Sequence, residues 1–413
     1  MLSVTFRNTL LAFALVSCVG LSTPSLAQTK QPDAFYRPPS PLPAAQHGKV
    51  IRSRPLTDAA ALPSAARNLL VMYHSTSEDG KDVAVTGTVA IPAGDPPAGG
   101  WPVTTWTHGT TGIAPFCAPS LDTPAGPEHQ FLGMHEVVMD DYVKRGYVVV
   151  ATDYEGLGPP GIHPFLQGAS EAHGALDLIR AAREIDPRVG TRYVAIGHSQ
   201  GGQADLFTAA LGPTYVPELK LLGNIALAPA SHIQATLNAM MHASAPSYAL
   251  GYAIYVLESF ASNHRDVKLK KILTPQALAH LPQTLDACIT STVSKGYWAT
   301  AIPKDQFIPG ADMTDVEKIA AQNEPSRLTI RVPTLIAQGT ADDTVMPAWT
   351  DNVVHALCKN GTPLEYAVYR GATHETVLTA ATARMQAWVD ARFAGKAAES
   401  NCSALPSAST PGK

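Results

Sequence analysis

Short apolar segments alternate with helix-like segments along most of this chain. The apolar segments are rich in β-branched residues and bounded by glycine, proline or polar residues, as is typical of buried strands. In the helix-like segments, apolar residues recur every three or four positions. This alternation predicts an α/β fold with a mostly parallel, doubly wound sheet. We expect strands at 68–75, 83–92, 103–107, 147–152, 192–197, 222–228, 329–338 and 364–369, the first two antiparallel, and helices at 137–145, 171–185, 348–360 and 376–392 and directly after Ser199.

The alternation stops between residues 230 and 327. This stretch has amphipathic helical pieces at 247–261 and 269–281 and no segment that reads as a strand of the sheet. We interpret it as an inserted, mainly helical cap. The expected organisation is a signal peptide (1–27), a Pro/Ala-rich N-terminal arm lying on the surface (28–65), a core in two parts (66–229 and 328–395), the cap between them (230–327) and a C-terminal tail (396–413).

The N-terminus has the pattern of an export signal. Arg7 precedes an apolar stretch from Leu10 to Leu21, and Ser25-Leu26-Ala27 fits a cleavage site for signal peptidase. The protein is therefore expected to be secreted or periplasmic, without an integral membrane span. An alternative is lipoprotein anchoring at Cys18, because Leu15-Val16-Ser17-Cys18 resembles a lipobox.

The composition of the chain argues against some classes of function. Hydrophobic residues make up 45% of the chain and charged residues 15%, which is typical of a globular protein. The net charge is −4 and there is no block of Lys and Arg, so nothing favours nucleic-acid binding. Beyond Cys18 the chain has four cysteines, Cys117, Cys288, Cys358 and Cys402, without a C-x-x-C spacing. In an exported protein they predict two disulfides, with three pairings open, rather than a metal site.

The segment Gly197-His198-Ser199-Gln200-Gly201 follows one of the expected strands and precedes a helix. A G-x-S-x-G motif in this context predicts a nucleophile elbow, a strained turn that exposes the serine hydroxyl. Small residues are needed at both ends because neighbouring backbone passes close to the turn. Ser199 is thus the candidate nucleophile.

A serine hydroxyl needs a base and a carboxylate that orients the base. In doubly wound hydrolases these follow the serine in the order acid, then histidine, each after a later strand. Asp342 follows the strand at 329–338, and its neighbour Asp343 is a rival for the same role. His374 follows the strand at 364–369 and lies where the base belongs. Asp342 would hold Nδ1–H of His374 and leave Nε2 to accept the proton of Ser199.

Two backbone N–H groups are expected to bind the developing oxyanion. One belongs to Gln200, at the N-terminus of the helix after Ser199. The other should come from the loop after the strand at 103–107, where we choose Thr110, with Thr111 as the second choice.

Beyond these motifs, residues 70–393 resemble the α/β-hydrolase superfamily and, within it, the secretory lipase family of the lipase A type. The resemblance is carried by the elbow, by His108-Gly109-Thr110-Thr111-Gly112 with Cys117-Ala118-Pro119-Ser120, by Thr152-Asp153-Tyr154-Glu155-Gly156-Leu157-Gly158, and by Ser170-Glu171-Ala172-His173 with Leu176-Asp177. It implies an exported, metal-independent hydrolase of carboxylic esters that needs no cofactor and has a helical cap over an acyl-binding pocket. It also implies the disulfides Cys117–Cys288 and Cys358–Cys402.

We therefore expect a secreted serine carboxylesterase or lipase that acts on small-molecule or lipid esters, with interfacial contact to lipid among its partners. The alternative is a serine peptidase of the same fold, similar to a prolyl aminopeptidase, which would need pocket carboxylates to hold a free amine. A non-catalytic binding protein is a third reading, and labelling of Ser199 by a phosphonate would distinguish it. Glu171 and Asp177 are expected to serve helix starts and surface pairs, and Asp153 and Glu155 to cap their turn.

Overall fold

A computed structural model of the chain describes residues 33–405. Its centre is a nine-stranded sheet with the order β1-β2-β3-β5-β4-β6-β7-β8-β9. Strands β1 to β3 and β5 pair antiparallel, and the pairs from β5 through β4 to β9 are parallel. The strands are β1 Val50–Pro55, β2 Arg67–Thr76, β3 Asp82–Ile91, β4 Trp101–Thr107, β5 Val148–Thr152, β6 Val189–His198, β7 Lys220–Leu227, β8 Thr334–Gly339 and β9 Leu364–Tyr369. This is the expected α/β-hydrolase fold.

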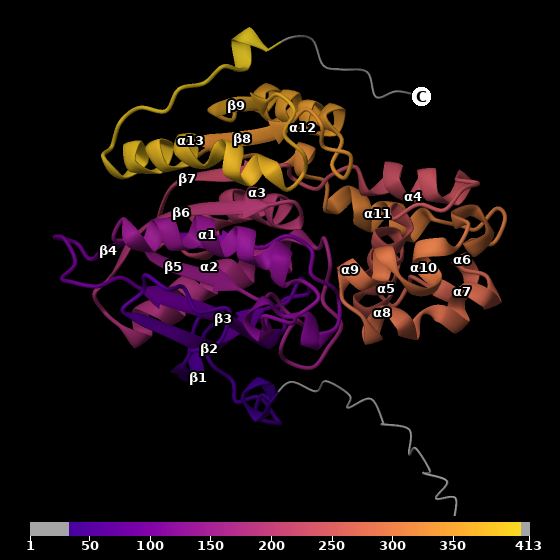
Figure 1. Cartoon of the computed structure of the whole chain (residues 1–413), viewed down its shortest axis with the longest axis horizontal. Coiled ribbons are helices and arrows are strands. Elements are labelled where there is room, and N and C mark those ends of the chain that lie inside the picture. Colours follow the sequence, from indigo (N-terminus) through magenta and orange to yellow (C-terminus); the bar gives the residue numbers. More distant parts are fainter. Residues whose placement is uncertain (1–32, 406–413) are drawn as a thin grey trace, which may run out of the picture. The chain divides into compact units, whose positions relative to one another are not determined.

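Helices cover both faces of the sheet (Figure 1). On one face, α1 (His129–Lys144) and α13 (Thr376–Phe393) bury residues such as Val143 and Met385 against the central strands. On the other face lie α2 (Gly168–Ile185), α3 (Gln200–Tyr215) and α12 (Pro347–Lys359). These helices bury apolar side chains against the sheet, which produces the two-sided core expected of a doubly wound sheet.

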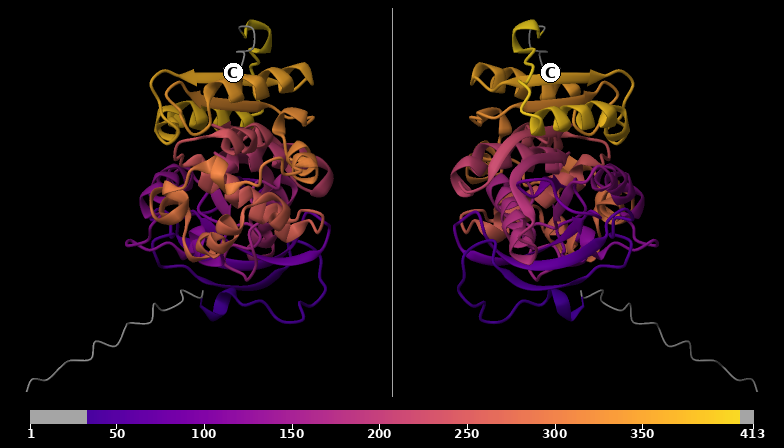
Figure 2. Two further views of the ribbon diagram at one scale, coloured as in Figure 1. Left: turned by 90° about the vertical axis from the view of Figure 1, so that its right-hand side faces the viewer. Right: turned by 90° about the vertical axis from the view of Figure 1, so that its left-hand side faces the viewer.

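The segment for which the sequence predicts a cap is helical in the structure. Its helices are α4 Ile233–His242, α5 Ala249–Asn263, α6 Leu269–Ile272, α7 Pro275–His280, α8 Pro282–Asp286, α9 Ile289–Ser294, α10 Gly296–Thr300 and α11 Thr314–Gln322. They gather at one end of the sheet (Figures 1 and 2) and share a hydrophobic core around α5 with Ile113, Phe165 and Leu166 of the preceding segments. Among the described residues, this segment contributes no strand to the sheet.

Two sequence expectations need correction. Part of the arm at 28–65 is an edge strand of the sheet, because β1 pairs with β2 over Val50–Pro55. The single helix expected at 269–281 is two, since Pro275 cannot continue a helix but suits the first position of α7, where Thr274 caps it. The signal peptide and Cys18 lie outside the described residues. Among the described residues, no helix is both long and apolar enough to span a membrane.

Candidate active site

Ser199 lies in a strained turn between β6 and α3. Its φ of 61° and ψ of −121° belong to a region that residues with side chains rarely occupy. A Cβ on Gly197 would lie 2.0 Å from the carbonyl oxygen of Gly201, and a Cβ on Gly201 would lie 1.9 Å from that of Thr107. Only glycine fits either position, so the elbow explains both glycines of the motif.

His374 and Asp342 lie together, on the loops that follow β9 and β8. Nδ1 of His374 is 2.8 Å from Oδ2 of Asp342. The carboxylate is held in turn by the backbone N–H groups of Thr344 and Val345 and by the side chain of Gln338. The structure thus places Asp342 beside His374, and not its rival Asp343.

The hydrogen bonds of His374 in the described chain do not include one from Nε2 to Ser199. Its imidazole bonds to Asp342, and its carbonyl accepts from Nε2 of His198 at 2.8 Å. Since a carbonyl only accepts, Nε2 of His198 carries the ring hydrogen. In the neutral ring Nδ1 then has none, and it accepts from Nε2 of His135 at 3.2 Å. Burial lowers the pKa of His198, and that of His135 to about 3, so both are neutral supports of the His374 loop.

Ser199 opens into a cavity of about 320 Å³ between the sheet and the cap. Apolar side chains from α4, α5 and the loop before α2 form most of its wall, and Thr110 lies on its rim. The backbone N–H groups of Thr110 and Gln200 donate to no other group in the described part of the chain. Thr111, the second choice for an oxyanion donor, does not line this cavity and uses its carbonyl to hold Ile289 of α9.

Charge in this cavity is sparse. Asp343 is the single charged residue among the described residues that line it. A peptidase that binds a free amine would need carboxylates here, so the lining disfavours that alternative.

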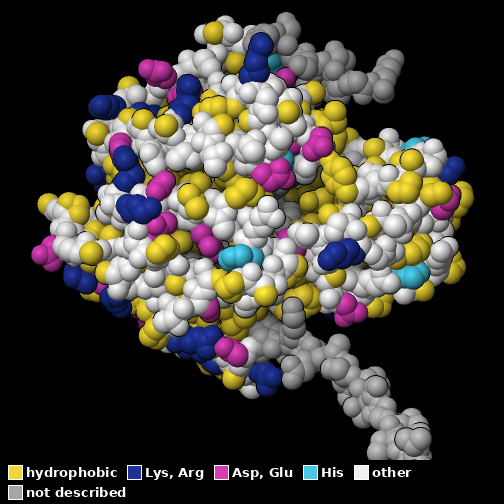
Figure 3. Space-filling model, in the orientation of Figure 1, with side chains coloured by type: hydrophobic (Ala, Val, Ile, Leu, Met, Phe, Trp, Pro, Cys, Tyr) yellow, Lys and Arg dark blue, Asp and Glu magenta, His cyan; other side chains and the backbone are white. Residues whose placement is uncertain are grey.

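On the face of the molecule shown in Figure 3, side chains of Lys and Arg are interspersed with Asp and Glu, and hydrophobic side chains lie between them.

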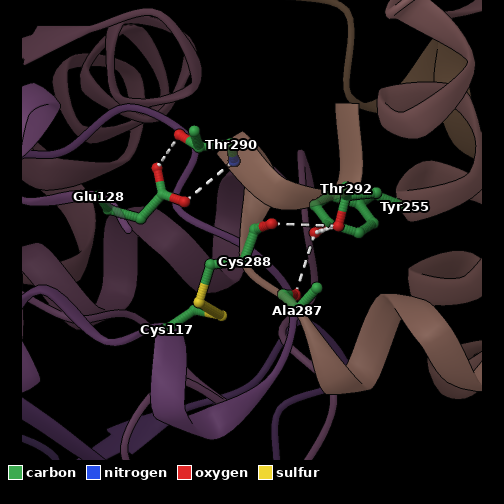
Figure 4. The surroundings of a disulfide bond; sticks show 7 residues. All are labelled: Cys117, Glu128, Tyr255, Ala287, Cys288, Thr290 and Thr292. Carbon is green, nitrogen blue, oxygen red and sulfur yellow. Dashed lines mark hydrogen bonds between the residues drawn. A yellow bond between two sulfur atoms is a disulfide. The ribbon is translucent and has the colours of Figure 1, made fainter. Parts of the chain in front are cut away.

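The loop that carries Thr110 is tied to the cap (Figure 4). A disulfide joins Cys117 to Cys288, at the start of α9. Next to it, the carboxylate of Glu128 accepts from the backbone N–H and the hydroxyl of Thr290, at 2.9 and 2.7 Å. A second disulfide joins Cys358 to Cys402. These are the two pairs that the family resemblance implies.

Three acidic residues are more deeply buried than the sequence predicts. Glu171 and Asp177 were expected near the surface, but both are fully buried. Glu171 lies on the same helical stripe as Ala175, Leu178 and Ala182, and this spacing was the available signal of its burial. Asp153 is also buried and accepts hydrogen bonds from Thr86 and Ser120, rather than capping only its own turn.

Comparisons with known proteins place the chain among lipases. The family model described as secretory lipase matches residues 128–401. A secreted triacylglycerol lipase, LIP4 of Malassezia globosa, is 26% identical over 389 residues, covering 90% of this chain and 82% of that protein. Lipase 6 of Candida albicans is 24% identical over 418 residues, covering 96% of this chain and 88% of that protein.

Solved structures show the same fold. Candida antarctica lipase A superposes with a TM-score of 0.73 at 20% identity, covering 91% of this chain and 89% of that one. The rice cell wall degrading esterase LipA of Xanthomonas oryzae superposes with a TM-score of 0.67 at 18% identity, covering 85% and 98%. The chain belongs to the secretory lipase family and is a carboxylic ester hydrolase with the α/β-hydrolase fold.

Proposed function

We propose that this enzyme cleaves lipid esters, triacylglycerols among them, through an acyl-enzyme on Ser199, with His374 as the base and Asp342 as its orienting acid. The observation that carries the proposal is the 2.8 Å contact between His374 Nδ1 and Asp342, on the loops that follow β9 and β8, at the same edge of the parallel sheet as the Ser199 elbow after β6. A carboxylate next to Nδ1 keeps the ring proton of His374 on that nitrogen. The lone pair of Nε2 is then free to accept a proton, as a base requires.

In the proposed reaction, Ser199 Oγ attacks the ester carbonyl while its proton passes to Nε2 of His374. The carbonyl oxygen becomes an oxyanion that the N–H groups of Gln200 and Thr110 stabilise, each worth about 3 kcal/mol. The intermediate collapses, the alcohol leaves with the proton from His374, and the acyl group stays on Ser199. Water then attacks the acyl-enzyme by the same steps and releases the carboxylic acid.

The cap and the N-terminus complete the proposal. The segment 230–327 is the cap domain, and its apolar cavity next to Ser199 suits an acyl chain. Residues 1–27 are proposed as the signal peptide of an exported enzyme, in keeping with two disulfides in the chain and with relatives that are named as secreted.

The test is the initial rate on p-nitrophenyl esters from acetyl to palmitoyl, with labelling by a serine-directed phosphonate. We expect turnover and labelling by the wild type, and loss of both in Ser199→Ala. Ser294→Ala, an exposed serine of the cap, is the matched control and should behave as the wild type. Turnover that survives in Ser199→Ala would contradict the mechanism. Labelling without ester turnover would move the substrate to amides.

A further inference from the structure

Three buried side chains meet behind the residue that follows the nucleophile. They are Glu171 on α2, Gln200 on α3 and His163 in the loop before α2, each at most 1% exposed. Nε2 of Gln200 lies 2.7 Å from Oε1 of Glu171 and 2.7 Å from Nε2 of His163. Oε1 of Glu171 also accepts from the backbone N–H of Leu166 at 3.1 Å. The side chain of Gln200 is therefore held at two points.

The histidine determines which way the amide of Gln200 faces. Nδ1 of His163 is 2.9 Å from the carbonyl oxygen of Glu155, which can only accept, so Nδ1 carries the hydrogen. Burial lowers the pKa of His163 to about 3, so the ring is neutral and its Nε2 is an acceptor. The NH₂ group of Gln200 must then be the end that faces His163 and Glu171.

This orientation leaves two buried oxygens without a donor in the described part of the chain. They are Oε1 of Gln200 and Oε2 of Glu171. An unsatisfied buried polar atom destabilises a fold, so two in adjacent groups need an explanation. Both belong to planar groups already joined by the bond from Gln200 Nε2 to Glu171 Oε1. One proton on Oε2 of Glu171, donated to Oε1 of Gln200, would close a paired acid–amide ring and satisfy both atoms.

We propose that Glu171 is a neutral carboxylic acid paired with the side-chain amide of Gln200, and that this pair positions the backbone N–H of Gln200 in the oxyanion site. Glu171 is thus a positioning residue, since it acts through Gln200 and lies behind the elbow. The catalytic part of this inference rests on the proposed function; the protonation of Glu171 does not.

The surroundings of Glu171 favour the neutral form. Burial raises its pKa to about 8, and Glu78 acts in the same direction. His163 is 3.6 Å away but neutral, and Tyr154, whose own pKa is raised by burial, is uncharged as well. No Lys or Arg is paired with Glu171 among the described residues. At neutral pH the proton therefore stays on the acid.

Ionisation would break this arrangement. Loss of the proton removes the O–H···O bond and brings a carboxylate oxygen against the amide oxygen of Gln200. The residue that supplies the oxyanion N–H would then shift, and small displacements of such donors lower kcat strongly. Glu171→Gln keeps both bonds of the pair, because its NH₂ replaces the O–H and its oxygen still accepts, but it cannot ionise.

Infrared difference spectroscopy tests the protonation without any turnover. At about pH 6, the wild type minus Glu171→Gln should contain the C=O stretch of a protonated carboxylic acid, and this band should disappear on titration through about pH 8. Glu155→Gln removes a nearby carboxyl that contacts Ser170 and not Gln200, and should keep the band. A difference spectrum that shows only a carboxylate at pH 6 would overturn the proposal.

The pH profile of kcat tests the positioning role. We expect the wild-type kcat to fall about tenfold or more above pH 8, and Glu171→Gln to keep its neutral-pH kcat without this fall. Glu171→Ala should lower kcat at every pH with little change in KM, and Glu155→Gln should retain the wild-type profile. An alkaline fall that persists in Glu171→Gln, or a loss in Glu171→Gln as large as in Glu171→Ala, would contradict the positioning role. If the wild type hydrolyses no ester, the proposed function fails while the infrared result still decides the pairing.

Discussion

Ser199 occupies a backbone conformation that most residues avoid, and it can do so because close contacts surround the turn on every side. Its N–H donates to the carbonyl of Leu227, and its carbonyl accepts from Gln203 and Ala230. A few contacts hold the side chains around it: Asp342 holds His374, and Glu171 and His163 hold the amide of Gln200. Because individual contacts position these groups, conservative substitutions that remove one contact each can test what that contact contributes to activity.

Gly201→Ala should disrupt the elbow. Its Cβ would lie 1.9 Å from the carbonyl oxygen of Thr107, so the backbone must move and both stability and activity should fall sharply. Gly133→Ala in α1 is the matched control, because nothing lies within 4 Å of its Cβ. Because alanine has a higher helix propensity than glycine, Gly133→Ala should stabilise the protein by up to about 1 kcal/mol. Thermal unfolding and ester turnover of both variants check this; equal behaviour would contradict the steric argument.

Asp342→Asn and Asp343→Asn separate the two candidate acids. An asparagine at position 342 can hold His374 in the wrong tautomer, so kcat should fall by about 10³–10⁴. Asp343 contributes its carbonyl to Tyr248 and does not contact His374 in the structure, so Asp343→Asn should change kcat far less. Steady-state kinetics on one ester suffices, and the reverse order of effects would assign the role to Asp343.

The elements around the site are held by connections between core and cap. The loop between β4 and α1 carries Thr110 and is our proposed oxyanion loop. It is joined to α9 by the Cys117–Cys288 disulfide, by Glu128 and by the bond from Ile289 N–H to the carbonyl of Thr111. By contrast, the Cys358–Cys402 disulfide joins α12 to the segment after α13, away from the cavity. The two bridges therefore have different consequences for activity.

Removal of either disulfide should lower stability. In the chain-entropy model, separations of 171 and 44 residues correspond to about 5 and about 4 kcal/mol. We expect Cys117→Ala with Cys288→Ala also to lower kcat below the melting temperature, since the oxyanion loop loses its tether. Cys358→Ala with Cys402→Ala should lower Tm without changing kcat. Similar kinetics in both double variants would show that the tether does not position the loop.

The cap cavity should limit the acyl chain. A methylene is about the size of a water molecule, which takes ~30 Å³, so 320 Å³ has room for about ten carbons. Ala253 on α5 lines the cavity and is fully buried. Ala253→Phe should fill part of it and lower the rate on dodecanoyl esters relative to butanoyl esters by at least about tenfold. An unchanged ratio would place the acyl chain elsewhere.

The whole molecule buries several carboxyl groups whose charged forms are disfavoured. Burial raises the pKa of Glu171 to about 8, those of Glu136 and Glu258 to about 7, and that of Asp153 to about 6. At pH values between the ordinary glutamate pKa of 4.5 and the raised pKa, the carboxyl group has lost its proton in the unfolded chain but keeps it in the folded state. Unfolding then releases protons, so stability is lost as pH rises through this window.

Glu171→Gln removes one such group. Its free energy of unfolding relative to the wild type should increase from about pH 5 to about pH 8, by an amount of the order of a few kcal/mol. Guanidinium unfolding at several pH values measures this difference. A difference that is constant with pH would show that Glu171 is ionised in the folded protein.

Hydrophobic periodicity and glycine requirements are local properties, so the alternation of strands and helices, the helical segment at 230–327 and the motifs after each strand could be predicted from the sequence alone. The parallel strands bring the loops after β6, β8 and β9 to one edge of the sheet. Ser199, Asp342 and His374 follow these strands in order, so the sequence predicted that they lie near one another. The sequence favoured Asp342 over Asp343, but that Asp342 is the one in contact with His374 needed the tertiary structure, since both follow the same strand. So did the burial of Glu171 and the use of residues 50–55 as an edge strand, because burial and strand pairing depend on contacts between segments far apart in sequence.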